Sequence, residues 1–133
     1  MSTDFDPQAH EAEARDRWGD SDAYKESARR TRSYTPEQWA SIKAELEGIE
    51  ARLAQLLESG AAANSEAAME AAEAARLHIH RWYYPCSHAM HAGLAEMYTA
   101  DARFKAHYDD RSEGLAGFVA GAIRANAARA GQA

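Results

Sequence analysis

One long amphipathic segment, between residues 35 and 60, constrains the fold of this chain more than any other feature. It opens with Thr35-Pro36-Glu37-Gln38, where a threonine N-cap precedes a proline at the first helical position and a glutamine at the third. Large apolar residues then recur at steps of three and four: Trp39, Ile42, Leu46, Ile49, Leu53 and Leu56. Gly60 is a typical C-terminal stop. The segment predicts a helix of roughly 37 Å, since each residue adds about 1.5 Å, and we interpret its apolar stripe as core.

The rest of the chain predicts further helices and no strands, because apolar and polar residues nowhere alternate over a useful length. Ser65, Ser87 and Asp101 are placed to cap three more helices, and Pro85 ends the first of these at about Tyr83. A last helix starts near Leu115. The 133 residues suffice for one domain with a modest core. We therefore predict an all-α fold, one domain over residues 1–133, with a helical core over 35–130.

The first 34 residues are rich in charge and poor in aliphatic side chains. Their large apolar groups are Phe5, Trp18, Tyr24 and Tyr34. Helical pieces are plausible over residues 8–17 and 22–31. Such a segment buries too little apolar area to order itself strongly. We predict that residues 1–34 form a lid segment that orders on a ligand.

Charge and composition exclude several classes of function. The net charge of −6 disfavours nucleic-acid binding by this chain alone, because that affinity comes mainly from Lys and Arg contacts to phosphates. The sequence contains neither an apolar run long enough to cross a membrane nor a secretory signal at its start. Its single cysteine, Cys86, is typical of a reducing compartment, and we expect a cytoplasmic protein.

Residues 77–91 hold four of the six histidines, the cysteine and three consecutive aromatic residues. Cys86 lies just before a predicted helix start, where the helix dipole favours a thiolate, so it is a candidate nucleophile. The alternative is a small buried apolar residue, which is the role of most lone cysteines. The residues alone leave both interpretations open.

The histidines raise the alternative of a metal- or haem-binding helical protein that uses His78, His80, His88 and His91. His78 and His80 are two positions apart, so on a helix they point in different directions. No carboxylate accompanies them in a recognised ligand spacing. We therefore predict no metal and no cofactor. A nucleophile with a recognisable His–Asp partner spacing is also missing, so we expect a binding protein and not an enzyme.

Trp82, Tyr83 and Tyr84 are consecutive, so their rings cannot all face the same side of a helix. At least one should point to the surface or into a cleft, where aromatic side chains commonly contact ligands.

A series of short motifs in this order is specific even though each piece is weak. The motifs are Asp4-Phe5-Asp6-Pro7, Arg17-Trp18-Gly19-Asp20-Ser21-Asp22-Ala23-Tyr24, Tyr34-Thr35 before Trp39, Tyr84-Pro85-Cys86, Met90-His91, Gly93-Leu94-Ala95-Glu96-Met97-Tyr98, Asp101-Ala102-Arg103-Phe104, Gly114-Leu115, Ala122-Ile123 and Ala125-Asn126-Ala127. Over almost its whole length the chain thereby resembles the TipAS-type antibiotic-recognition domains, which form the C-terminal part of thiopeptide-induced regulators of the MerR type.

The resemblance implies an all-α, globin-like domain with a cleft for thiopeptide macrocycles, closed by an N-terminal segment that orders on the ligand. It also implies a reactive cysteine that adds to a dehydroalanine of the antibiotic, and Cys86 matches that position. The function implied is a drug sensor or a sequestration domain, dimeric only when attached to a regulator's coiled coil. The residues that we expect to contact the ligand are Cys86 (covalently), Trp82, Tyr83, Tyr84, His88, Met90, His91, Tyr98, Trp18 and Tyr24.

Overall fold

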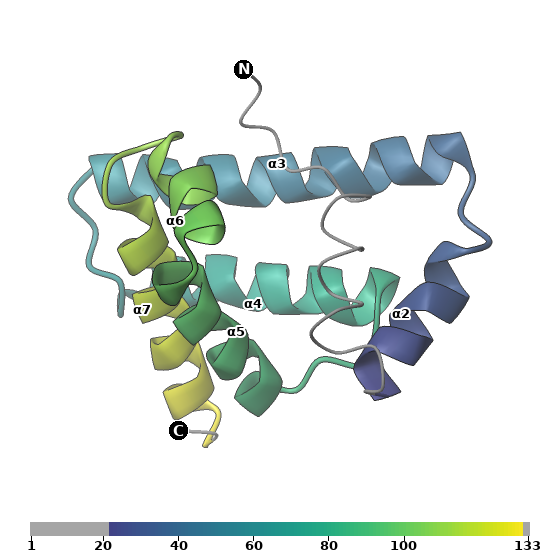
Figure 1. Ribbon diagram of the computed structural model, residues 1–133. Helices are drawn as coiled ribbons and strands as arrows, with labels where there is room; N and C mark the ends of the chain where they lie inside the picture. Colours follow the sequence, from purple (N-terminus) through teal and green to yellow (C-terminus); the bar gives the residue numbers. More distant parts are fainter. Residues whose placement is uncertain (1–21, 132–133) are drawn as a thin grey trace.

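The computed structural model describes residues 22–131, and within them every regular element is an α-helix. The helices are α2 (Asp22–Thr31), α3 (Pro36–Glu58), α4 (Glu66–Trp82), α5 (His88–Ala100), α6 (Ala102–Asp109) and α7 (Leu115–Arg129). The all-α fold predicted from the sequence is confirmed. Figure 1 shows α5, α6 and α7 gathered toward one end of α3 and α4, and α2 at the other end.

Local sequence signals define the helix ends. The Thr35 hydroxyl accepts from the Gln38 backbone N–H at 3.1 Å, and the Gln38 side chain accepts from the Thr35 N–H at 2.9 Å. Gly60, just past the end of α3, has a φ of +86°, which favours glycine. The side chains of Ser65, Ser87 and Asp101 cap α4, α5 and α6 as predicted. Short-range chemistry therefore sets most of these boundaries.

The core is built around α7, where nine of the fifteen residues are buried. The buried set is rich in alanine, which lets helix backbones approach closely: Leu53, Ala54, Ala68, Ala71, Ala72, Ala95, Leu115, Ala116, Val119, Ala120, Ala122 and Ile123 belong to it. Gly121 marks the tightest approach, since a Cβ at this position would lie 3.0 Å from the Cβ of Ala63. Small side chains therefore hold α7 against the α3–α4 connection.

Helix α2 is attached differently, since none of its residues is buried. Arg30 Nη1 donates to the carbonyl of His80 at 2.9 Å, and the Tyr34 hydroxyl donates to the carbonyl of Trp82. We call these two contacts the α2 latch. They connect α2 and the residues that follow it to the C-terminal end of α4 through polar contacts.

In the described part of the chain, residues 22–131, no helix combines the length and the apolar character that crossing a bilayer requires.

Candidate functional site

A cavity of about 680 Å³ lies between the helices, and each helix from α2 to α7 contributes to its wall. This volume falls within the range of pockets that hold drug-sized molecules. Its wall is mostly apolar or aromatic, with Ala23, Tyr24 and Ala28 from α2, Trp39, Leu46, Ile49 and Leu53 from α3, Ile79 from α4, Met90, Leu94, Met97 and Tyr98 from α5, Phe104 and Tyr108 from α6, and Val119 and Ile123 from α7.

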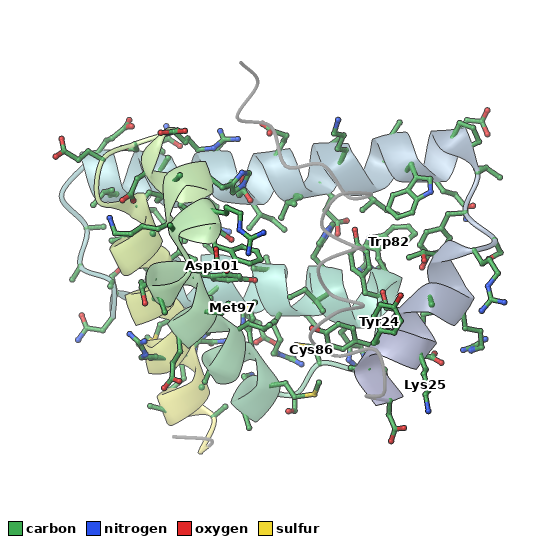
Figure 2. All side chains as sticks on the ribbon, in the orientation of Figure 1. Tyr24, Lys25, Trp82, Cys86, Met97 and Asp101 are labelled. Atoms are coloured by element: carbon green, nitrogen blue, oxygen red, sulfur yellow. The ribbon has the colours of Figure 1, made fainter. Side chains whose placement is uncertain are left out.

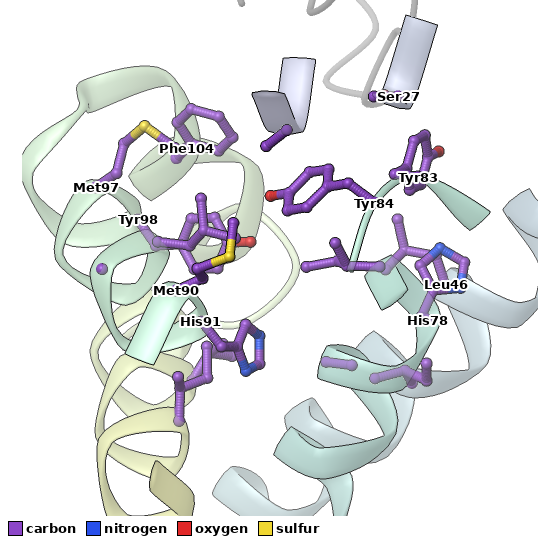
Figure 3. Close-up of a pocket in the computed structure, with 18 of the residues that line it drawn as sticks. Ser27, Leu46, His78, Tyr83, Tyr84, Met90, His91, Met97, Tyr98 and Phe104 are labelled. Atoms are coloured by element: carbon purple, nitrogen blue, oxygen red, sulfur yellow. The ribbon is translucent and has the colours of Figure 1, made fainter. Parts of the chain in front are cut away.

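Six of the ligand-contact residues predicted from the sequence line this cavity: Tyr24, Tyr83, Tyr84, Met90, His91 and Tyr98. They come from three separate parts of the chain. Tyr24 belongs to α2, Tyr83 and Tyr84 follow α4, and the other three belong to α5. Figure 3 shows Tyr84, Met90, Tyr98 and His91 around one pocket.

Aromatic side chains form one wall. The ring of Tyr98 lies 5.5 Å from that of Phe104 and 5.3 Å from that of Tyr108, between centroids. Burial raises the pKa of Tyr83 and of Tyr84 to about 12. Their hydroxyls therefore stay protonated near neutral pH and can donate hydrogen bonds from an otherwise apolar wall.

A buried carboxylate interrupts the wall on α3. Glu50 is 4% exposed, and both of its carboxylate oxygens lie 3.0 Å from His107 Nε2. Arg111 Nη2 approaches the same carboxylate at 3.7 Å. Because His107 and Arg111 both pair with it, this carboxylate is not left without a partner in the wall.

Two further histidines, His78 on α4 and His91 on α5, face the same cavity and are 3% and 2% exposed. His78 Nδ1 lies 2.6 Å from Glu45 Oε1, which also accepts from Trp82 Nε1 at 3.1 Å. Burial, helped by the nearby Arg76, lowers the pKa of His91 to about 4, so this ring is neutral near pH 7.

Cys86 corrects one expectation from the sequence. It lies one residue before the N-cap of α5, in the connection from α4 (Figure 2), but it is 1% exposed and is not part of the cavity wall. Burial raises the pKa of its thiol to about 11, against the lowering effect of Arg76. The predicted stabilisation of a thiolate at a helix start is therefore wrong for this conformation, because desolvating the thiolate outweighs the helix dipole.

The backbone of Cys86 is held on both sides. Its N–H donates to His80 Nδ1 at 3.1 Å, and its carbonyl accepts from Arg76 Nη1 at 2.7 Å. Arg76 in turn pairs with Glu73, whose carboxylate also contacts His88 Nε2 and Asn126 Nδ2. The cysteine thus lies at the edge of a polar cluster that joins α4, α5 and α7.

Two other predicted contact residues lie away from the cavity. Trp82 packs edge-on against Tyr34, with ring centroids 5.8 Å apart, and His88 is engaged with Glu73 at 3.0 Å. Figure 2 shows Trp82 at the end of α4. Neither belongs to the cavity wall. Trp18 and the helix expected over residues 8–17 lie outside the described residues.

The histidine group does not form a metal centre in the described part of the chain. His78, His80 and His88 contact Glu45, the Cys86 N–H and Glu73 separately. Across residues 22–131, no three side chains of His, Cys, Asp or Glu converge as metal ligands would. The metal- or haem-binding alternative is therefore not supported.

Sequence reasoning missed the contribution of α3 to this cavity. The stripe that we interpreted only as core places Trp39, Leu46, Ile49 and Leu53 on the cavity wall. One signal was available: Glu50 lies four residues after Leu46 and three before Leu53, so it puts a carboxylate on the apolar face. A charged residue at such a position indicates a partner or a cavity.

Comparisons with known proteins agree with this arrangement. The sequence model of the family described as "TipAS antibiotic-recognition domain" matches residues 10–126. The transcriptional activators TipA of Streptomyces coelicolor and of Streptomyces lividans are each 45% identical over 126 residues, which is 95% of this chain and 50% of theirs. The activator mta of Bacillus subtilis is 35% identical over 99 residues, 74% of this chain and 37% of its own length. The chain thus spans about half the length of the TipA relatives.

Solved structures match as well. TipAS of Streptomyces lividans in complex with nosiheptide, from a thiopeptide resistance system, superimposes with a TM-score of 0.86 at 45% identity, over 96% of this chain and 89% of that one. The antibiotic-binding domain of a TipA-class multidrug resistance regulator gives a TM-score of 0.62 at 42% identity, over 67% of this chain and 95% of that one.

Proposed function

The chain belongs to the TipAS antibiotic-recognition domain family, and on that premise we propose that it binds bulky thiopeptide-type antibiotics in its helical cavity. The observation that carries the proposal is the cavity itself. It measures about 680 Å³, has a largely apolar wall, and lies in a fold that matches a nosiheptide complex. A macrocycle of apolar rings gains free energy by leaving water for such a wall.

The position of α2 supports binding of a large ligand. Ala23, Tyr24, Ser27, Ala28 and Thr31 line the cavity from a helix that has no buried residue of its own. Contact with a bound macrocycle would give this helix the apolar burial that it lacks. We therefore propose that the ligand and the lid segment, residues 1–34, stabilise each other.

A glycine pair allows a matched test. Gly93 lines the cavity, and a Cβ there meets nothing within 4 Å; Gly48, exposed on α3, has equal space but lies outside the wall. Both are helical, so leucine improves helix propensity at either site. We expect Gly93→Leu to weaken nosiheptide binding at least about tenfold, because its side chain occupies ligand space, and Gly48→Leu to bind normally. Calorimetric titration measures this, and wild-type protein that binds no thiopeptide would refute the function.

We further propose that Cys86 captures a dehydroalanine-bearing ligand covalently. The sulfur would form a bond to the β-carbon of the alkene, the π bond would break, and the α-carbon would take up a proton. No group leaves, so the protein gains the whole mass of the ligand. Because the thiol is buried with a raised pKa, capture requires the segment from Tyr84 to Ser87 to expose it after docking. Tyr84 already reaches the cavity wall two residues away.

Intact-mass spectrometry under denaturing conditions tests the capture step. Wild-type protein should gain one nosiheptide mass, and adduct formation should accelerate as pH rises from 7 to 9, because the thiolate fraction grows about tenfold per unit. Cys86→Ala should still bind reversibly but form no adduct. An adduct in Cys86→Ala would place the reaction elsewhere, and tight binding without added mass would leave Cys86 a packing residue.

The wider role follows from the relatives. We propose a binding domain and not an enzyme, which either sequesters the drug or reports it to a promoter when joined to DNA-binding parts. The relatives are named as transcriptional activators, so we also propose a cytoplasmic location, where such regulators meet DNA.

A further inference from the structure

Two buried ring nitrogens define a polar requirement on the ligand. Among residues 22–131, the buried side-chain nitrogen and oxygen atoms without a hydrogen-bond partner are His78 Nε2 and His91 Nδ1. A buried polar atom of this kind is unfavourable, and folded proteins rarely retain one without a use. Both residues line the same cavity, although they come from different helices.

The two rings lie on opposite sides of the cavity (Figure 3). His78 belongs to the α4 side with Ile79, and His91 belongs to the α5 side with Met90 and Leu94. Both nitrogens are closed to solvent in the ligand-free conformation, so we expect a molecule in the cavity to contact them once the two rings turn toward it.

The partners of His78 fix what its free nitrogen offers. Its Nδ1 lies 2.6 Å from Glu45 Oε1. Burial acts to raise the pKa of Glu45, but hydrogen bonds from His78 and Trp82 lower it overall, so the carboxylate is ionised and only accepts. His78 Nδ1 must then carry a proton, and a ring whose single proton is on Nδ1 leaves Nε2 as an acceptor for a ligand N–H.

We propose that His78 and His91 are specificity-determining residues. Each forms a hydrogen bond with an uncharged amide group of the bound macrocycle. The inference rests on the proposed function and narrows its ligand class. His78 Nε2 selects a ligand with an inward N–H donor, such as a peptide amide. His91 Nδ1 faces a second amide group across the cavity. Purely hydrocarbon macrocycles would leave both nitrogens unpaired and bind more weakly.

The test uses nosiheptide and a Cys86→Ala background, so that the reversible dissociation constant is measured without adduct formation. His78→Asn keeps an amide donor near the Nδ1 position for Glu45 but removes the Nε2 acceptor. His78→Gln extends an amide to the Nε2 position instead. We expect His78→Asn to raise the dissociation constant at least about fivefold, and His78→Gln to recover part of that loss.

For His91, the pair is His91→Leu and His91→Asn. His91→Leu should raise the dissociation constant about tenfold while the melting temperature of the free protein stays equal or rises, because an unpartnered polar atom leaves the interior. His91→Asn should recover part of the affinity. Glu96→Leu, on the exposed face of the same helix, is the control and should bind as the background does.

The outcomes separate the two proposals. A background protein that binds no nosiheptide overturns the proposed function and the inference with it. Normal binding by the background together with unchanged affinity in His78→Asn and His91→Leu overturns the inference alone. A loss of affinity in His91→Leu that is matched by a fall in melting temperature also overturns it, because the histidine would then only support the fold.

Discussion

Helices α2 and α7 border the same cavity but are held to the rest of the molecule by different forces. In α7, nine of fifteen residues are buried, and Val119 and Ile123 reach the cavity wall from within the core. In α2 no residue is buried, and the latch of Arg30 and Tyr34 fastens it to carbonyls at the end of α4. Apolar burial is cooperative, whereas exposed polar contacts contribute little each.

The difference teaches how one small domain can be both stable and open to a large ligand. The α7 side supplies the wall that we expect to be rigid, since its alanine-rich face is packed into the core. The α2 side supplies a wall with no buried residue of its own, so we expect it to open at a lower free-energy cost than α7. Access to the cavity should therefore depend on α2, and global stability on α7.

The strongest test of the comparison truncates the core. Leu115 is fully buried in α7 and lies outside the cavity wall. Leu115→Ala should lower the free energy of unfolding by about 2–5 kcal/mol, because it loses apolar burial and leaves a void. Urea denaturation followed by circular dichroism measures the change. A loss below about 1 kcal/mol would mean that α7 can relax, and the contrast with α2 would disappear.

Acid provides a second test, on the core side of the cavity. Burial lowers the pKa of His91 to about 4, so the folded protein holds this ring neutral while the unfolded chain takes up a proton below about pH 6.5. Stability should be full above pH 6.5 and fall on the order of 2–3 kcal/mol by pH 4. Denaturation curves at several pH values should show this fall in wild type and a flatter profile in His91→Leu.

Glu73 provides a control for the dependence of stability on pH. Hydrogen bonds from Arg76, above all, lower the pKa of Glu73 to about 2, although burial opposes this shift. Its contribution is therefore present above about pH 4.5 and lost as the pH falls toward 2, which is a separate window. If His91→Leu fell as steeply as wild type between pH 6.5 and 4, another group would carry the acid sensitivity.

The sequence predicted the fold well because helix ends are local. Thr35, Ser65, Ser87 and Asp101 act within four residues of themselves, so their capping needs no knowledge of the tertiary structure. The burial of Cys86 could not be predicted in this way. Its exposure depends on how α4, α5 and α7 converge, and burial decides whether the thiol or the thiolate is favoured.

The candidate site was predictable in part for the same reason. The unusual cluster in residues 77–91 predicted four ligand contacts that line the cavity: Tyr83, Tyr84, Met90 and His91. Glu50 and His107 are 57 positions apart, and their contact exists only in the folded chain. The stripe on α3 serves both core and cavity, and periodicity alone does not separate these roles.

The smallest expected effect on stability comes from removing the α2 latch. This variant tests most directly whether α2 controls ligand release without supporting the fold as α7 does. The double variant Arg30→Gln with Tyr34→Phe removes the two side-chain donors that hold α2 to α4. Global unfolding should change by less than about 1 kcal/mol, because these contacts lie near the surface and water replaces them. Dissociation of nosiheptide should nevertheless become several-fold faster, because α2 forms one wall of the cavity.

Stopped-flow displacement in the Cys86→Ala background measures that rate, and Arg52→Gln is the matched control. Arg52 belongs to an exposed ion pair with Glu70, 4.0 Å away, and lies outside the cavity wall, so its loss should leave dissociation unchanged. If the double variant unfolded as readily as Leu115→Ala, α2 would be part of the core. If it instead kept both wild-type stability and wild-type dissociation, the ligand would leave by another route, and the weak attachment of α2 would have no bearing on binding.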